Sequence, residues 1–286
     1  MKNRPVFFLL AFLIPLGSIA QDDLLDMIDD EDDEVSYVMS VFQGTHIING
    51  HSSKTKGKGA LDFLIYHRFG PVNSGISEFF GLDQANMRLG FEYGITDVFD
   101  LGIGRSTYEK TYDGYIKWKF IRQQTEGGSP FTMVFFSSIA IGTNETVDEI
   151  STSDRIGYTF EFLISRKFGQ KFSLQLMPGV IHLNAVPTAL DNNDIYYTGI
   201  AFRYKLTPGL ALTGEYYYRY NPLQSVETYD AIGIGVDIET GGHVFQLHFT
   251  NARPTFEKGF ITDTRDDFWD GDIRFGFNIS RTFQLR

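Results

Sequence analysis

The sequence predicts an all-β protein: a single antiparallel up-and-down transmembrane β-barrel of about twelve strands, preceded by a signal peptide and an acidic N-terminal segment. Two observations lead to this prediction. Beyond residue 59, nearly every segment alternates between apolar and polar residues with period two, which is typical of strands with two different faces. Short turns and longer loops then alternate along the chain, as they do in bacterial outer-membrane barrels.

The first twenty residues have the features of a secretory signal peptide. Lys2 and Arg4 supply the positive charge, Val6–Leu16 form the apolar core, and Ser18-Ile19-Ala20 is a small-x-small cleavage site. The apolar run is short for a bilayer core of about 30 Å. We therefore expect cleavage after Ala20, rather than a retained anchor, and export to the cell outer membrane.

Residues 21–58 are expected to form an acidic, partly disordered periplasmic segment or a plug. Asp22–Glu34 holds nine acidic residues and no basic one, against a net charge of −11 for the whole chain. Such a run usually stays solvated, and the alternative is that it recruits a periplasmic protein. Val35–Lys58 is neither purely acidic nor clearly alternating, so two placements stay open: inside the lumen as a plug, or below it.

Residues 59–286 are expected to form the barrel. The predicted strands span roughly 60–69, 85–95, 98–107, 113–123, 131–142, 155–168, 171–183, 195–207, 210–220, 229–239, 243–251 and 271–285. Connections after even-numbered strands are mostly tight and those after odd-numbered strands mostly longer, although 108–112 is short and 124–130 is not. An even number of strands places both termini at the short-turn end, which is periplasmic in such barrels.

Each predicted strand has one apolar face and one small or charged face. The apolar faces are expected to meet lipid, because a closed barrel satisfies every backbone polar group internally. The other faces are expected to line a wet lumen, since twelve strands enclose more space than their own side chains fill. The lumen-lining candidates are Arg88, Glu92, Lys117, Lys119, Glu161, Arg203, Lys205, Glu215, Arg219 and Arg274.

Aromatic residues and one unusual strand add to this picture. Candidates for the interfacial girdle near strand ends are Tyr93, Trp118, Tyr196, Tyr218 and Tyr220. The stretch 131–142 (FTMVFFSSIAIG) is apolar on both faces. We therefore expect its inner face to pack against an inserted loop or against the N-terminal segment.

The sequence contains no convincing catalytic, metal or cofactor site. Without cysteine, the chain has no disulfide and no thiolate nucleophile or ligand. His46 and His51 are interpreted as loop histidines rather than metal ligands. His182 and His248 lie on predicted strands, and no sequence pattern brings them to a serine, so catalysis is not expected. No basic face indicates nucleic-acid binding.

Three blocks of the sequence resemble a known family: GTHIINGHSSKTKGKGALDFLIYHRFG (44–70), EFFGLDQANMRLGFEYGITDVFDLGIGRSTYEKTYDGYIKWKFIRQ (78–123) and FGFNISRTFQL (275–285). They resemble a Bacteroidota-type outer-membrane β-barrel family that is catalogued only as a domain of unknown function. The resemblance is close over the first half and the last strand, and looser through 124–270. It implies a barrel in the outer membrane and carries over no activity, cofactor or site residue.

The expected function is a narrow pore or channel for small polar or anionic solutes, with outer-membrane lipid as the surrounding partner. One alternative is a structural or docking barrel that recruits a periplasmic protein through Asp22–Glu34. A lipid-modifying outer-membrane enzyme is the weakest alternative. The sequence leaves open whether the lumen is open or plugged.

Overall fold

The computed structural model describes residues 36–38, 41–144, 151–240 and 243–285. These residues belong to the unit Ser36–Arg286. The predicted signal peptide (1–20) and the acidic run Asp22–Glu34 lie outside the described residues, so both stay predictions.

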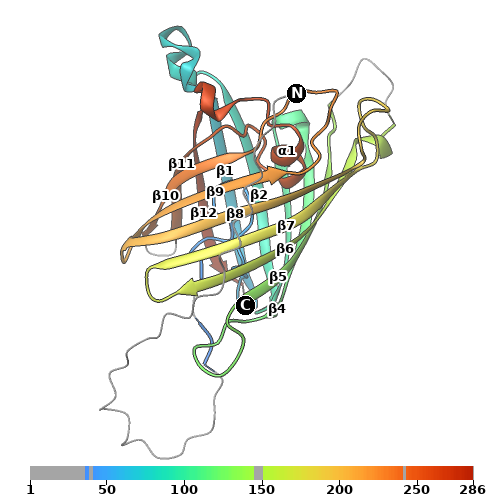
Figure 1. The fold of residues 1–286 in the computed structure, drawn as a ribbon. Coiled ribbons are helices and arrows are strands. Elements are labelled where there is room, and N and C mark those ends of the chain that lie inside the picture. Colours follow the sequence, from blue (N-terminus) through green and yellow to red (C-terminus); the bar gives the residue numbers. More distant parts are fainter. Residues whose placement is uncertain (1–35, 39–40, 145–150, 241–242, 286) are drawn as a thin grey trace, which may run out of the picture. The chain divides into compact units, whose positions relative to one another are not determined.

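Twelve antiparallel strands form one closed barrel, which confirms the predicted fold class (Figure 1). Each strand pairs with its neighbours in the sequence, and the first strand pairs with the last to close the wall. The strands are β1 (Ala60–Pro71), β2 (Ala85–Thr96), β3 (Phe99–Ser106), β4 (Tyr112–Ile121), β5 (Thr132–Ile141), β6 (Ile156–Phe168), β7 (Phe172–Leu183), β8 (Asp194–Thr207), β9 (Leu210–Arg219), β10 (Ile232–Thr240), β11 (His243–Thr250) and β12 (Arg274–Gln284). Closure matters because it removes the unpaired edges that an open sheet would present to lipid.

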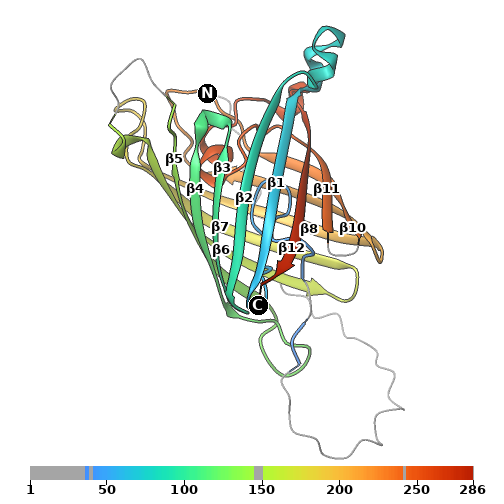
Figure 2. The same ribbon diagram turned by 180° about the vertical axis from the view of Figure 1, so that it is seen from behind.

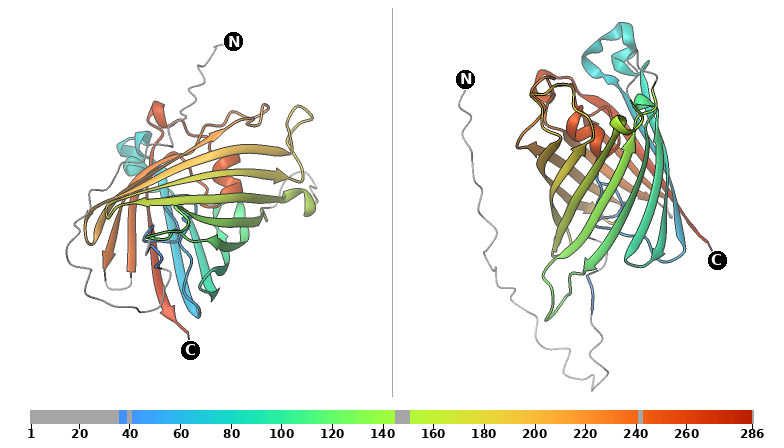
Figure 3. Two further views of the ribbon diagram at one scale, coloured as in Figure 1. Left: turned by 60° about the horizontal axis from the view of Figure 1, so that its bottom comes forward. Right: turned by 90° about the vertical axis from the view of Figure 1, so that its right-hand side faces the viewer.

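The connections divide between the two ends of the barrel, as Figures 1 and 2 show. Connections after even-numbered strands gather at one end, the short-turn end, and those after odd-numbered strands gather at the other, the long-loop end (Figure 3). The long loops carry the short helices η1 (Val72–Ser74), η2 (Ile76–Gly81), η3 (Tyr108–Lys110), η4 (Ser153–Arg155), α1 (Glu257–Thr262) and η5 (Phe268–Asp270). Among the described residues, no helix is long and apolar enough to cross a membrane.

The apolar side chains of the strands point outward and the polar ones inward. On the outer surface, Phe91 is 46% exposed and Ile103 is 59% exposed. Their sequence neighbours Glu92 and Gly102 lie on the inner face, where Glu92 is fully buried. This alternation follows from the pleat, which sends successive side chains to opposite faces of a sheet.

Exposed aromatic side chains occur at both ends of the wall. Tyr93 and Trp118 lie toward the short-turn end of β2 and β4, whereas Tyr196, Tyr218 and Tyr220 lie toward the long-loop end. All five are exposed on the outside. Their placement at two levels matches the aromatic girdles that flank the apolar band of membrane barrels.

The lumen contains its own core. Residues 41–58, the plug segment, enter the barrel from the short-turn end and turn back inside it, and the loop that carries α1 enters from the long-loop end (Figures 1 and 3). The buried cluster inside the barrel includes Phe42, Ile47, Ile48, Tyr115, Val134, Phe136, Leu163, Met177, Ile181, Tyr197, Tyr217, Phe260 and Ile261. Plug segment, wall and α1 loop all contribute to it, so burying this apolar surface favours the filled lumen.

Strand β5 is the apolar strand that needed an inner partner. Val134 and Phe136 point inward and are completely buried. The ring of Phe136 lies 4.4 Å from that of His51 on the plug segment. The inner face of this strand therefore packs against the N-terminal segment, which confirms the prediction for 131–142.

Candidate functional site: the filled lumen

The plug segment turns back on itself inside the barrel. His46 and His51 form an antiparallel bridge, and the amide of Ile47 donates to the carbonyl of Gly50 at 2.9 Å. The amide of Ser52 donates to the carbonyl of Thr45 at 2.8 Å. These contacts make residues 45–52 a tight hairpin, and the chain reverses at residues 47–50, the plug tip. The Asn-Gly dipeptide at 49–50 is a common turn signal.

A wall carboxylate on β9 receives the plug tip. The backbone amides of Ile48, Asn49 and Gly50 donate to the carboxylate of Glu215 at 3.3, 2.7 and 3.4 Å. Three amides directed at one carboxylate form charge-assisted hydrogen bonds, which are stronger than those between neutral groups. Glu215 is itself buried, so these amides replace the water that it would otherwise bind.

Strands β11, β12 and β1, which follow β9 and β10 around the barrel, bind the carbonyl side of the same tip. Arg68 on β1 donates to the carbonyl of Ile48 at 3.0 Å and to the side-chain oxygen of Asn49 at 3.1 Å. Asn278 on β12 donates to the carbonyl of Ile48 at 2.9 Å. Gln246 on β11 donates to the carbonyl of Ile47 at 2.8 Å. Both the amides and the carbonyls of the tip are therefore bound by one arc of the wall, from β9 to β1.

The chain leaving the tip is paired by a side chain instead of a strand. The amide of Ser53 donates to the side-chain oxygen of Gln175 at 2.8 Å, and the side-chain nitrogen of Gln175 donates to the carbonyl of His51 at 2.8 Å. Gln175 on β7 thus supplies the donor and acceptor that a neighbouring strand would supply. The hydroxyl of Ser53 also lies 2.5 Å from that of Ser165 on β6.

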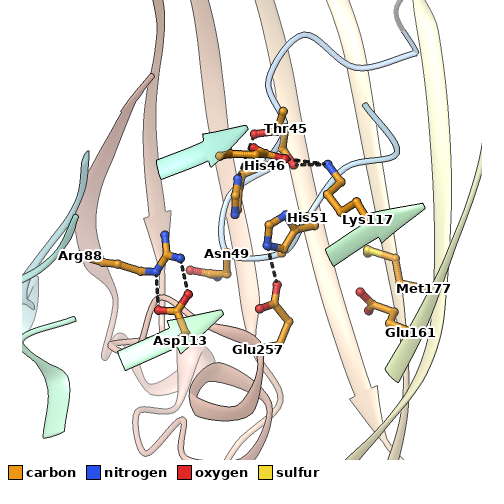
Figure 4. Close-up of polar contacts among 12 residues, drawn as sticks. Thr45, His46, Asn49, His51, Arg88, Asp113, Lys117, Glu161, Met177 and Glu257 are labelled. Carbon is orange, nitrogen blue, oxygen red and sulfur yellow. Dashed lines mark hydrogen bonds and ion pairs between the residues drawn. The ribbon is translucent and has the colours of Figure 1, made fainter. Parts of the chain in front are cut away.

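The two plug histidines lie at the centre of the lumen (Figure 4). Their ring centroids are 3.8 Å apart. Nδ1 of His46 lies 2.7 Å from the hydroxyl of Tyr66, and Nε2 of His51 lies 3.6 Å from a carboxylate oxygen of Glu257 on α1. His46 and His51 lie outside the named strands and helices, as expected for loop histidines, but the hairpin buries both of them in the lumen core. Within the described residues, no group of three or more histidine, cysteine, aspartate or glutamate side chains is placed so that it could hold a metal ion.

One glycine sets how closely the tip approaches the wall. A Cβ added at Gly50 would lie 1.7 Å from the hydroxyl oxygen of Tyr217. Tyr217 is fixed from behind, since its ring centroid lies 5.0 Å from that of Phe260 and its hydroxyl 3.5 Å from the sulfur of Met177. Only a residue without a side chain fits the tip at this distance.

A family model described as "Membrane bound beta barrel domain (DUF5777)" matches residues 42–283. The chain belongs to this family. The match begins within the plug segment, so the plug is part of the shared domain together with the wall. No curated protein matches the sequence.

Solved structures with similar folds include two porins and a channel. The NanC porin has a TM-score of 0.48 at 10% identity, covering 79% of this chain and 100% of its own. The KdgM porin has a TM-score of 0.47 at 10% identity, covering 78% and 99%. The COG4313 outer membrane channel from Pseudomonas putida F1 has a TM-score of 0.45 at 12% identity, covering 81% and 98%.

In this membrane-bound barrel, the ten lumen-lining candidates all lie on the inner side of the wall. Buried among them are Arg88, Glu92, Lys117, Glu161, Arg203, Glu215, Arg219 and Arg274, while Lys119 and Lys205 are partly exposed near the short-turn end. At the buried positions the side chains face protein rather than an open channel. Their part in conduction stays a prediction.

Most of these charges are matched by partners on the wall, on the plug or in the long loops. Arg88 forms a two-pronged ion pair with Asp113 (Figure 4), with one nitrogen–oxygen distance of 2.8 Å. Lys117 lies 3.6 Å from Glu92 and donates to the carbonyl of Lys54. Further ion pairs join Arg203 to Asp237, Arg219 to Asp230, and Arg274 to Asp266. Such pairing lowers the cost of burying charge inside the lumen.

The sequence identified only part of this network, because both members of the Lys117–Glu92 pair were candidates but the aspartates that pair with the arginines were not. Asp113 on β4 and Asp237 on β10 were not among the candidates, although both alternate inward. The strand registers come from the structure. They place Asp113 opposite Gly104 and Asp237 opposite Gln246. Asp113 and Asp237 occupy inward positions in the period-two alternation, as the candidates do. This alternation was the sequence signal that could have identified them.

The histidines considered for catalysis lie on opposite faces of the wall. His182 on β7 is outside, where its ring nitrogen lies 2.7 Å from Asp194. His248 on β11 is buried inside. The two side chains are therefore separated by the sheet and do not share a site.

Proposed function

We propose that this protein is an outer-membrane channel for small polar or anionic solutes, and that the plug segment closes it in the described arrangement. The observation that supports the proposal is how the plug tip is bound. Its backbone is held by polar and charged side chains of the wall, among them Glu215, Arg68 and Gln175. Water can replace these hydrogen bonds, so a withdrawn plug would leave a wall that hydrates readily.

The orientation follows from the number of strands. Twelve strands place the plug entrance and the C-terminal end of β12 at the same short-turn end, which is the periplasmic end in barrels of this kind. Cleavage after Ala20 would leave the acidic run Asp22–Glu34 on that side of the membrane. Withdrawal of the plug would then be towards the periplasm.

The decisive experiment ties the plug to the wall. Because the chain has no cysteine, a Ser53→Cys/Ser165→Cys pair would be its only thiols, and their native oxygens are 2.5 Å apart. We expect the reduced protein to open intermittently in planar bilayers and the oxidised protein to stay closed, with reductant restoring opening. Ser165→Cys alone is the control and should not respond to oxidant.

The filled lumen also fits the second function, a structural or docking barrel that recruits a periplasmic protein through Asp22–Glu34. Such a barrel needs no path for solutes. The same recordings separate the two, because a folded, reduced protein that never conducts would contradict the channel and favour the docking barrel.

The wall alone gives weak support for a preference for anions. The basic candidates outnumber the acidic ones, but Asp62, Asp100, Asp113 and Asp237 are also buried within the barrel. The inner wall is therefore of mixed charge. A preference for anions would instead arise where basic side chains are not balanced by buried carboxylates. The short-turn mouth of the barrel is the candidate for such a place.

A further inference from the structure

A pocket of about 290 Å³ opens at the short-turn mouth, between the plug segment and the wall. Its lining residues are Val38, Val41, Ser53, Lys54, Thr55, Lys56, Gly57, Asp97, Lys119, Arg122 and Thr132. Four of these residues are basic and one is acidic. The pocket is thus more cationic than the balanced wall deeper inside.

Among the residues that the structure describes, three of the four cations form no ion pair with a carboxylate. Lys119 and Arg122 form no ion pair among the described residues, and the guanidinium of Arg122 lies 3.8 Å from the ring centroid of Tyr37. The ammonium of Lys54 donates to the carbonyl of Gln43, a neutral acceptor. Only Lys56 is neutralised, through its ion pair with Asp62.

The nearby carboxylates are already engaged elsewhere. Asp97 accepts from the amide of Lys58 at 2.9 Å, and Asp100 accepts from the amide of Lys56 at 2.9 Å. Glu92, farther in, lies 3.6 Å from Lys117. Asp100 still attracts Lys119 electrostatically. Among the described residues, however, no carboxylate forms an ion pair with Lys54, Lys119 or Arg122, so these three cations keep donors available for another anion.

A second opening shares two of these cations. A pocket of about 460 Å³ is lined by Tyr37, Val98, Lys119, Phe120, Ile121, Arg122, Gln124 and Ser129. Lys119 and Arg122 therefore stand between two hollows at the mouth. An anion has access to them without displacing the plug tip.

We propose that this mouth pocket binds a small phosphate-type oxyanion between Lys54, Lys119 and Arg122. A guanidinium presents a planar fork of donors that matches an oxyanion, and two ammonium groups add point charges. The inference deepens the proposed channel function, on which it rests for its biological role, because it names the anion class that the mouth selects. Binding itself requires no conduction.

Binding of inorganic phosphate to the full-length protein in neutral detergent, measured by equilibrium dialysis, tests the site. We expect Lys119→Gln and Arg122→Gln each to weaken binding at least tenfold. Lys205→Gln is the matched control, since this lysine also lies near the short-turn end but outside the pocket. Retention of native folding in each variant is checked by circular dichroism.

A second probe, soluble short-chain phosphatidylglycerol, distinguishes a free oxyanion from a lipid headgroup as the source of the phosphate. A site for free oxyanions binds inorganic phosphate at least as tightly as this lipid, whereas a headgroup site favours the lipid tenfold or more. Equal binding by wild type, Lys119→Gln and Arg122→Gln, for both probes, would overturn the inference. A protein that binds phosphate but never conducts would overturn the channel and leave the site standing.

Discussion

At the scale of single residues, the contact between Gly50 and Tyr217 determines whether the lumen can be filled. The tyrosine is buried and held by Phe260 and Met177, so it has little freedom to retreat. The glycine lies in the tip that Glu215 binds. Gly50 therefore takes part both in the close contact with Tyr217 and in the hydrogen bond to Glu215, so a change at this residue affects both.

Gly50→Ala should lower the stability of the barrel by about 1–3 kcal/mol, the usual cost of overpacking a filled core. The added methyl would overlap the Tyr217 hydroxyl, which forces the tip away from Glu215. The measurement is the temperature at which the folded band is lost in heat-dependent gel migration.

Gly57→Ala is the control on the same segment, because an added Cβ there meets only an oxygen of Asp97, at 3.8 Å. This variant should migrate like wild type at every temperature. If Gly50→Ala behaves in the same way, the tight contact with Tyr217 does not exist in the membrane.

At the scale of elements, one carboxylate joins two long loops. Asp191, in loop 184–193, accepts from the amides of Gln224 and Ser225 at 2.7 and 3.0 Å and from the Ser225 hydroxyl. It also accepts from the amide and hydroxyl of Thr188. The hydrogen bond from the Ser225 hydroxyl, more than any other, holds the pKa of Asp191 below its usual value.

This lowered pKa predicts how the loop contact depends on pH. A depressed pKa in the folded state stabilises the contact above the ordinary aspartate pKa of about 3.9 and loses that contribution as the pH falls through the lowered value. We expect protection of the Ser225 amide from hydrogen exchange, corrected for intrinsic rates, to be constant from neutral pH down to about 4 and to fall below it.

Asp191→Ala should abolish that protection already at neutral pH, because the acceptor of the Ser225 amide is gone. Asp194→Ala is the control, since its carboxylate contacts His182 on the outer surface. Wild-type protection in Asp191→Ala would show that the loops are held together by other contacts.

The strands could be predicted from the sequence because each one carries its own signal. Alternation and turn residues are local, and most predicted boundaries differ from the observed ones by one or two residues. The larger errors in the strand boundaries occur where residues expected in a strand form hydrogen bonds with a loop instead. Strand β10 was expected from 229 but begins at Ile232, since the amide of Tyr229 donates to Thr264. Strand β12 was expected from 271 but begins at Arg274, since the amide of Asp272 donates to Asp267.

The plug could not be predicted in the same way, because its partners are distant side chains rather than a neighbouring strand. Gln175 and Gln246 bind its backbone from β7 and β11, across more than a hundred residues of sequence. A segment paired by side chains needs no alternation, so residues 44–53 carry no periodic signal. The sequence clue to the plug was indirect: β5 is apolar on its inner face and required a partner.

At the scale of the whole molecule, the outward apolar faces form a continuous band around the closed wall. Ile103 lies on this band in the central part of β3, opposite Phe91 and Gly114. Leu206 lies on the same surface but next to the turn at 208–209. The two positions differ in depth while sharing chemistry and exposure to lipid.

Ile103→Lys should destabilise folding into lipid vesicles by about 2–4 kcal/mol, the cost of a lysine near the bilayer midplane. Leu206→Lys should cost about 0–1 kcal/mol, because its ammonium reaches the headgroups. Both values come from urea titrations in vesicles. Equal penalties at the two sites would contradict the placement of the band in hydrocarbon.

The reach of the plug contacts also dictates an order of assembly. The segment is made first, yet Gln246 holds it from 199 positions farther along the chain, and Asn278 holds it from 230 positions farther along. Such contacts are entropically costly until the intervening chain is organised. The plug segment therefore acquires its final structure last, and a bound tip reports that the final hairpin has been inserted and the barrel closed.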